Sequence, residues 1–585
     1  MAGFNKMGVI LLAASLGCMF LQLCSATRYY DFVLKETNFT RLCSTKSILT
    51  VNGSFPGPTI KVHKGETIYV NVHNQGLYGV TIHWHGVKQP RNPWSDGPEN
   101  ITQCPIQPGS SFTYEVVFSN EEGTLWWHAH SDWTRATVHG AIVILPAAGT
   151  KYPFAAPHAQ HPIILGSWFK SDVMEVINSA LATGADPNIS DAFTINGQPG
   201  DLYSCSKAST YRLKVDYGKT YMLRIINAIM NEEQFFAIAN HTLTVVTQDA
   251  AYIKPITTSY IMITPGQTMD VLVTANQPRS HYYMASSAYA DGIVPFNNST
   301  TTAILQYRGN YSTPSTIPLP SLPIYNDTTA ADSFTALLKS LASKAHPISV
   351  PTKITTRIYM TIAINERICP NASCAGPDNN AIAASLNNIS FETPSIDILQ
   401  AYYGGINGVF EGNFPSNPPH FYNFTGDYDN STIYPTFGAK VKFIKYGEGV
   451  EIVFQGTNLI APENHPMHLH GFSFYVIGTG YGNFNATESP KTYNLVDPPE
   501  VNTVGVPKNG WTTIRFLADN PGMFICSVSM SMVYALSFGK TFQLGNGHCD
   551  HSEKWKHNKV EASPTTCPYA SLLQVLDLLL ISYPK

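Results

Sequence analysis

Charged residues are scarce in this chain, and their scarcity excludes several classes of partner. Asp, Glu, Lys and Arg make up 13% of the 585 residues, against about a quarter in typical soluble domains, and the formal net charge is only −4. A protein that binds nucleic acid or an anionic membrane surface presents a concentrated basic face. We therefore expect neither nucleic acid nor a membrane among its partners.

Apolar runs long enough to cross a membrane are also missing. The run that follows Lys6 is short, lies close to the start and ends in small residues, so it predicts a signal peptide over residues 1–26. A second apolar stretch, 571–583, is interrupted by Asp577, which argues against a lipid-anchor signal.

Cysteines and glycosylation sequons agree with a secreted protein. Of ten cysteines, Cys18 and Cys24 lie in the signal segment, and the remaining eight fit an oxidising compartment. Cys369 and Cys374 are close enough to pair locally or to remain free. Sequons of the Asn-x-Ser/Thr type predict heavy glycosylation, with the two adjacent asparagines competing. They lie at Asn38, Asn52, Asn100, Asn188, Asn240, Asn297, Asn298, Asn310, Asn326, Asn371, Asn388, Asn423, Asn430 and Asn485.

Paired histidines are the chemistry-bearing feature of the chain. In a His-x-His pair on a strand, both imidazoles point to one face, because strand side chains alternate. One pair alone is equally well explained by two surface histidines, but three pairs beside Trp or Gly predict a metal centre. Imidazole suits copper, zinc or iron. The histidines concerned are His83, His85, His128, His130, His465, His468 and His470.

The chain also contains an internal repeat, which locates a defect in this pattern. Ser527 stands where the first copy has His128. Ser529 likewise stands in the place of His130. The second copy has therefore lost its second histidine pair. The matching segments are 65–86 with 447–471, and 112–130 with 511–529.

Further motifs resemble those of the plant laccases, which are secreted multicopper oxidases. The resembling segments are WSDGP, ITQCPIQPG, TLWWHAH, APENHPMHLHGF and NLVDPPE, and the resemblance covers residues 27–548. It implies an all-β fold of three cupredoxin-like Greek-key β-sandwich domains. It also implies one-electron oxidation of phenolics such as lignin precursors, with reduction of O2 to water. The expected location is the extracellular space, apoplast or cell wall, and the expected state is a monomer.

The resemblance assigns roles to the histidines around four copper ions. It gives the type-2 copper His83 and His468, and one type-3 copper His85 and His128. The other type-3 copper receives His130 and His470, and the type-1 copper receives His465. Asp96 resembles the acidic residue that relays protons near the type-2 copper, although an Asp before Gly97 also stabilises a turn.

The fourth copper motif of the family is degenerate in this chain. The family has His-Cys-His followed by another His, whereas the ligand positions here are Ser527, Val528, Ser529 and Val533, with Phe538 at the axial position. A blue-copper site needs a thiolate and two imidazoles, and valine has no donor atom. The sequence therefore predicts fewer copper ions than the family's four and no laccase turnover. The alternative function is a non-catalytic extracellular copper- or phenolic-binding glycoprotein.

Three possibilities remain open for the missing copper ligands. A two-residue slip of the strand would bring Cys526 to the place of Val528 on the same face. The cluster at 548–551 offers Cys and His donors, but lies about twenty residues beyond the strand. The segment 523–547 and the tail both depart from the family. Either a local error in the sequence or degeneration after gene duplication explains both departures.

Domain organisation follows from chain length and strand pattern. About 560 mature residues are too many for one core, and short alternating runs such as TIYVNVHN and MDVLVTA, separated by Gly, Pro and Asn turns, predict β-sandwiches. A helix capped by Asp332 is expected over 332–343. By resemblance, Cys43 pairs with Cys205 and Cys104 with Cys567. The expected boundaries are 27–147, 148–310, a linker at 311–333, 334–550 and a tail at 551–585.

Overall fold

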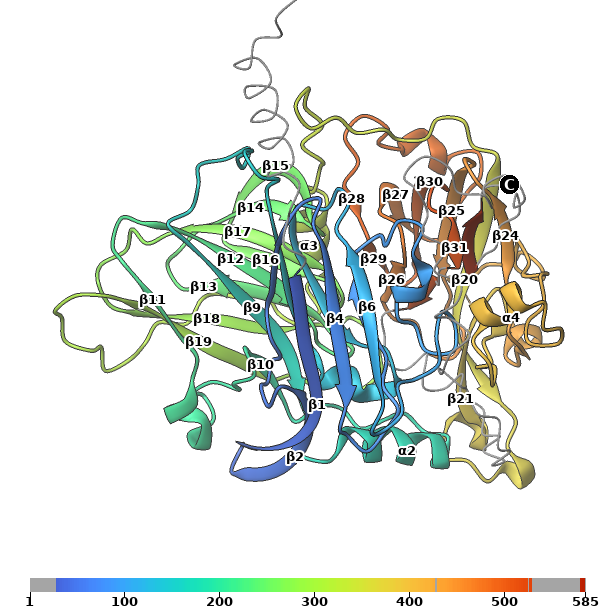
Figure 1. The fold of residues 1–585 in the computed structure, drawn as a ribbon, viewed down its shortest axis with the longest axis horizontal. Coiled ribbons are helices and arrows are strands. Elements are labelled where there is room, and N and C mark those ends of the chain that lie inside the picture. Colours follow the sequence, from blue (N-terminus) through green and yellow to red (C-terminus); the bar gives the residue numbers. More distant parts are fainter. Residues whose placement is uncertain (1–27, 427–428, 524–525, 529–578, 584–585) are drawn as a thin grey trace, which may run out of the picture.

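The computed structural model describes residues 28–426, 429–523, 526–528 and 579–583. Strands form most of the regular structure, so the predicted all-β class is confirmed. In the view of Figure 1, the blue strands of the first sandwich stand between the green second sandwich and the orange-to-red third one. Within the described ranges, no helix is long and apolar enough to cross a membrane. The predicted signal peptide lies outside these ranges.

The first sandwich carries two of the three histidine pairs. Its sheets enclose a core that includes Phe32, Trp84 and Trp127, because alternate residues of each strand face inward. One sheet has the order β2 (Ser44–Val51), β1 (Arg28–Arg41), β4 (Thr67–Asn74) and β6 (Ser111–Val117). The other has the order β3 (Ile60–His63), β8 (His139–Leu145), β7 (Gly123–Ala129) and β5 (Ile82–His85).

The second sandwich contains none of the predicted ligands and has the largest apolar core of the described chain. Its first sheet runs β10 (Ala192–Ile195), β9 (Ala159–Trp168), β12 (Thr220–Asn227), β17 (Thr268–Thr274), β14 (Leu243–Gln248) and β15 (Ala251–Thr258). Its second sheet runs β11 (Arg212–Val215), β19 (Thr300–Tyr307), β18 (His281–Tyr289), β13 (Glu233–Ile238) and β16 (Tyr260–Ile263).

The third sandwich carries the last histidine motif. Its large sheet runs β23 (Thr436–Phe437), β22 (Ile389–Ser390), β21 (Ala381–Leu386), β20 (Thr356–Arg367), β25 (Gly449–Gly456), β30 (Gly510–Leu517), β27 (Phe474–Tyr481) and β28 (Glu500–Val501). Two small sheets face it: β24 (Lys442–Lys445), β33 (Leu579–Tyr583) and β31 (Gly522–Met523), then β29 (Thr503–Val506), β26 (His465–Leu469) and β32 (Cys526–Val528). The end of the predicted tail thus supplies a strand to this sandwich.

Short helices lie between some of the strands, and one differs from its prediction. Helix α3 spans Thr328–Thr335, so the predicted helix at 332–343 is wrong at both ends. Asp327, rather than Asp332, caps it by accepting a hydrogen bond from the backbone N–H of Ala330 at 2.9 Å. Asp332 lies inside the helix and accepts the hydroxyl proton of Tyr481. The other α-helices of the described ranges are α2 (Val173–Thr183) and α4 (Ile398–Gly404).

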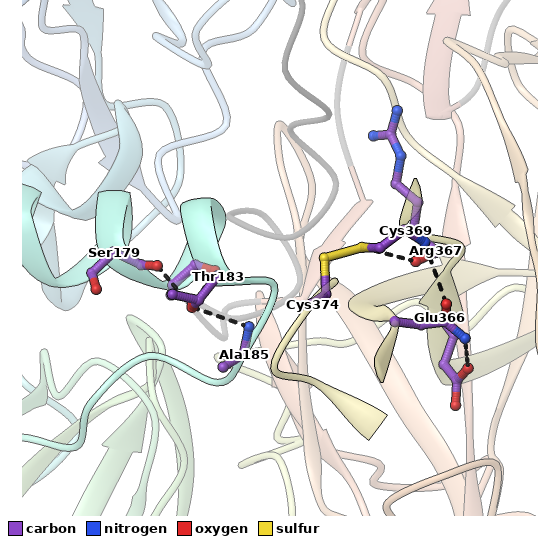
Figure 2. The surroundings of a disulfide bond; sticks show 9 residues. Ser179, Thr183, Ala185, Glu366, Arg367, Cys369 and Cys374 are labelled. Carbon is purple, nitrogen blue, oxygen red and sulfur yellow. Dashed lines mark hydrogen bonds between the residues drawn. A yellow bond between two sulfur atoms is a disulfide. The ribbon is translucent and has the colours of Figure 1, made fainter. Parts of the chain in front are cut away.

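One disulfide joins distant segments of the chain, and another closes a short loop. The expected Cys43–Cys205 bond is present, with the two Cα atoms 5.4 Å apart. Cys369 pairs with Cys374, which settles the alternative left open by the sequence. Figure 2 shows this bond near the C-terminal end of α2, where the backbone N–H of Ala375 donates to the carbonyl of Thr183 at 2.8 Å. Cys104 is buried, and Cys567, its predicted partner, lies outside the described residues.

The two adjacent sequons have different surroundings. Asn297 is buried and donates its amide N–H to Ser190 Oγ at 2.9 Å, whereas Asn298 is exposed. A glycan on Asn297 would displace this packing, so of the two we expect Asn298 to be the acceptor.

Candidate metal centre

The first two histidine pairs come together because β5 and β7 are antiparallel neighbours. Their register places His83 opposite His128 and His85 opposite Trp126. Side chains of like parity share a face, so the histidines of both strands point to the same side of the sheet. That side meets the third sandwich, where β26 carries His468 and leads into His470.

Six histidines from these three motifs form one cluster at the contact between the first and third sandwiches. His83 lies at its centre, with ring centroids 4.0 to 5.6 Å from the other five. His130 and His470 are 5.2 Å apart between ring centroids. The ligand atoms of His83, His85 and His468 all lie within 4.8 Å of one another. Residues nearly 400 positions apart in the chain therefore converge on one small volume.

Two pairs of ring nitrogens in the cluster face each other with their lone pairs. His83 donates its Nδ1–H to the carbonyl of Asp96 at 2.7 Å, and His468 donates its own to the carbonyl of Asn502 at 2.8 Å. In neutral rings with these hydrogen bonds the Nε2 atoms carry the lone pairs, and they approach to 3.4 Å. Two lone pairs at this distance repel, unless a cation lies between them.

His85 and His128 repeat this arrangement. Thr503 donates its hydroxyl proton to Asn502 Oδ1, so its oxygen accepts the Nε2–H of His85 at 2.9 Å. His128 donates its Nδ1–H to the carbonyl of Ala129 at 2.8 Å. The lone pairs of His85 Nδ1 and His128 Nε2 then face each other at 3.3 Å. Hydrogen bonds from the outer ring nitrogens are the usual way in which proteins orient metal-binding imidazoles.

Burial keeps five imidazoles of the cluster uncharged. Loss of hydration lowers the pKa of His85, His128, His468 and His470 well below the usual value, and the neighbouring imidazoles lower it further. The pKa of His130 falls to about 3 for the same reason. His470 Nε2 is buried without a hydrogen-bond partner. Neutral imidazoles with inward lone pairs fit copper or zinc.

Asp96 lies under the cluster on a sharp turn. It follows the short helix η1 (Pro93–Ser95), is fully buried and accepts the Nδ1–H of His470 at 3.0 Å. Gly97 has a φ of +98°, and a Cβ atom there would lie 1.9 Å from the carbonyl oxygen of Ile82. The turn is therefore pressed against β5, and both the carbonyl and the carboxylate of Asp96 contact histidines.

The strand that should complete the centre holds the register that the repeat predicts. In β32, Ser527 lies opposite His468, as His128 lies opposite His83 in the first sandwich. Val528 lies opposite Met467, so the two-residue slip that would bring Cys526 to this position is wrong. Burial raises the pKa of the Cys526 thiol to about 12, which keeps it protonated.

The remaining predicted positions of this motif are not part of the described chain. Ser529, Val533, Phe538 and the cluster at 548–551 lie outside the described residues.

His465 does not share the hydrogen bonds of the six-histidine cluster. It begins β26 and is fully buried, and neither ring nitrogen has a hydrogen-bond partner in the described part of the chain. Burial lowers its pKa to about 4. Among the described residues, the groups of three metal-binding side chains do not include His465. Within the described part of the chain, His465 therefore lacks the neighbouring donors that each histidine of the six-histidine cluster has.

Several residues of the centre carry no recognisable sequence signal. Asn502 and Thr503 orient His85 and His468 through the contacts above, although only the neighbouring NLVDPPE motif stood out in the sequence. Trp126 packs against His128, with ring centroids 4.3 Å apart, and donates its indole N–H to the carbonyl of Gly266 at 3.0 Å. For Trp126, the available sequence signal was its place beside a histidine pair.

Comparison with known proteins identifies the family. Three family models described as multicopper oxidase match residues 33–149, 159–310 and 413–532. Laccase-14 of Arabidopsis thaliana is 52% identical over 501 residues, which cover 85% of this chain and 87% of that protein. Putative laccase-9 of Oryza sativa subsp. japonica is 50% identical over 541 residues, covering 88% and 93%. The crystal structure of a laccase from Botrytis aclada matches with a TM-score of 0.66 at 25% identity, covering 87% of this chain and 86% of that one. The chain therefore belongs to the plant laccases, a family of multicopper oxidases.

Proposed function

We propose that this chain is a secreted laccase-family copper protein that has kept the oxygen-side histidine cluster and has lost phenol-oxidising turnover. The observation that supports the proposal is the register of β32, in which Val528 lies opposite Met467. By the family resemblance, Val528 occupies the position of the thiolate ligand. The ancestral reaction is one-electron oxidation of phenolics, such as lignin precursors, with reduction of O2 to water. When bound, copper supplies the redox chemistry of such proteins.

Six histidines of the chain could still serve the ancestral reaction, whereas His465 could not. His83 and His468 would hold the type-2 ion, and the pairs His85–His128 and His130–His470 would each hold one type-3 ion. Asp96 is placed to hold a proton beside His470. His465 cannot make a blue-copper site alone, because such a site needs a thiolate and a second imidazole.

Electron entry is therefore the step that fails. The protein is then a non-catalytic copper- or phenolic-binding glycoprotein rather than an active laccase. The predicted signal peptide, the sequons and the disulfides support an extracellular location, in the apoplast or cell wall. We propose that the protein acts there as a monomer.

Copper content and visible absorption of the secreted, copper-loaded protein test the proposal. We expect about one to three copper ions per chain, no intense blue thiolate-to-copper band, and no oxidation of simple phenols. The matched control is an intact plant laccase prepared in the same way. A blue band together with four copper ions would contradict the proposal, because a thiolate would then be bound to copper.

A further inference from the structure

The second sandwich supplies no histidine to the cluster, yet it contacts both sandwiches that do. On the side of the first sandwich, Trp126 donates to the carbonyl of Gly266, and Thr268 donates its hydroxyl proton to the carbonyl of Thr124. Both acceptors and donors are buried. The loop between β16 and β17 thus lies directly behind β7, which carries His128.

On the side of the third sandwich, the contact runs through one buried carboxylate. Asp249 lies in the turn between β14 and β15 and is only 4% exposed. Its Oδ1 accepts the backbone N–H of Thr268 at 2.9 Å. Its Oδ2 accepts two N–H groups of the third sandwich, from Asn502 at 3.0 Å and from Thr503 at 3.1 Å.

The conformation of this turn is unusual for the residues in it. Asp249 has a φ of +47° and Ala250 a φ of +59°, in a region that non-glycine residues avoid at a cost of about 1 to 2 kcal/mol each. Strained residues of this kind persist where surrounding contacts fix them. Here the three N–H groups held by one carboxylate are those contacts.

The segment that Asp249 holds is the one that orients the histidines. The carbonyl of Asn502 accepts the Nδ1–H of His468, and this bond directs the Nε2 lone pair of His468 toward His83. The hydroxyl of Thr503 accepts the Nε2–H of His85 at 2.9 Å. A shift of the Asn502–Thr503 segment would therefore rotate one ring of each facing nitrogen pair.

We propose that Asp249 is a positioning residue for the metal centre, holding the Asn502–Thr503 segment and through it the rings of His468 and His85. Gln267 acts with it, since its Nε2–H donates to the carbonyl of Thr503 at 2.8 Å. The second sandwich is thus a frame that sets the geometry of a site to which it gives no ligand. The inference rests on the proposed copper binding by the cluster.

The test is the substitution Asp249→Asn, which preserves shape and removes at least one acceptor. Asp216→Asn is the matched control, because Asp216 is in the same sandwich but pairs with Arg308 at the surface. Both proteins are secreted, stripped and titrated with Cu²⁺ at a temperature where both are folded. We expect Asp249→Asn to bind Cu²⁺ about 10- to 100-fold more weakly and to change the Cu²⁺ EPR spectrum, as loss of groups behind metal ligands does. Asp216→Asn should match the unaltered chain.

A purely structural role would lower the melting temperature of Asp249→Asn but leave its Cu²⁺ affinity and EPR spectrum unchanged, and this result would overturn the inference. If Asp249→Asn is not secreted, Gln267→Met carries the same test, with the same two readouts. If the unaltered chain itself binds no Cu²⁺, the proposed function fails. Binding by the unaltered chain with no difference in the variants defeats only the inference about Asp249.

Discussion

Two histidines of the same strand differ in their hydrogen bonds. His465 and His468 are three positions apart on β26, and both are buried. His468 donates to a backbone carbonyl and faces another imidazole, whereas neither nitrogen of His465 has a hydrogen-bond partner among the residues described. The first arrangement persists because it holds a site together. The second is what the proposed loss of the other type-1 ligands would leave.

The substitution His465→Leu should therefore stabilise the metal-free protein. A buried polar group without a partner costs about 1 to 3 kcal/mol, and leucine removes that cost at similar volume. We expect the free energy of unfolding in urea to rise by about 1 kcal/mol. His468→Leu is the control and should lower it, because the carbonyl of Asn502 loses its donor. A fall of similar size in both variants would show that His465 has a partner that matters.

Acid should destabilise the metal-free protein through the same residue. Burial lowers the pKa of His465 from 6.5 to about 4. Below pH 6.5 the unfolded chain takes up a proton that the folded chain does not, so stability is lost as pH falls from 6.5 to 4. This group alone accounts for about 3 kcal/mol of loss. Unfolding at pH 7 and pH 4 should show a smaller loss in His465→Leu than in the unaltered chain; equal losses would refute the assignment.

Restoring the missing ligands should restore the blue site. The fourfold variant should acquire an intense blue absorption band and oxidise phenols, because a thiolate then joins two imidazoles. The single variant Val528→Cys is the control and should stay colourless, since it still lacks the second imidazole. Absence of the band in the fourfold variant would mean that the scaffold has changed beyond these positions. The four substitutions are Ser527→His, Val528→Cys, Ser529→His and Val533→His.

At the scale of secondary-structure elements, the sequence predicted what repeats along the chain. The gapless match of the two copies predicted that Ser527 takes the place of His128, and the register of β32 agrees. Local signals were less reliable: Asp332 was the predicted cap of α3, whereas the structure has Asp327. The proposed role of Asp249 and the contacts of Thr503 had no sequence signal at all, because they depend on a hydrogen bond from the backbone N–H of Thr503 to the carboxylate of Asp249, about 250 positions away.

The turn that holds Asp96 should be intolerant of any side chain at Gly97. Gly97→Ala would place a Cβ atom 1.9 Å from the carbonyl oxygen of Ile82, which precedes His83 on β5. We expect a loss of more than about 4 kcal/mol in the free energy of unfolding, together with loss of bound copper. Gly109→Ala is the matched control: its φ of +81° is similar, but no atom lies within 4 Å of the added Cβ. It should cost only about 1 kcal/mol, and an equal cost in both variants would contradict the argument.

For the molecule as a whole, the second sandwich makes buried polar contacts with both of the other two. A buried network around Arg224 joins it to the first sandwich: Arg224 Nη1 lies 3.1 Å from Asp270 Oδ1 and donates to Thr124 Oγ1 at 2.7 Å. Thr124 is on β7, the strand that carries His128. Together with the contact of Asp249 on the third sandwich, this network ties the positions of both ligand-bearing sandwiches to the one that carries none.

Removing Arg224 alone should lower the free energy of unfolding far more than removing Arg224 and Asp270 together. Arg224→Met leaves Asp270 as an unpaired buried charge, and we expect the free energy of unfolding in urea to fall by about 3 to 5 kcal/mol. Changing both residues, with Asp270→Leu added, should recover most of the loss, because the charge is then absent. Arg308→Met is the matched control: its pairing with Asp216 is at the surface and should be worth less than about 1 kcal/mol. If the double variant were no more stable than Arg224→Met, the penalty would come from lost packing between the sandwiches, and the buried charge would not be its cause.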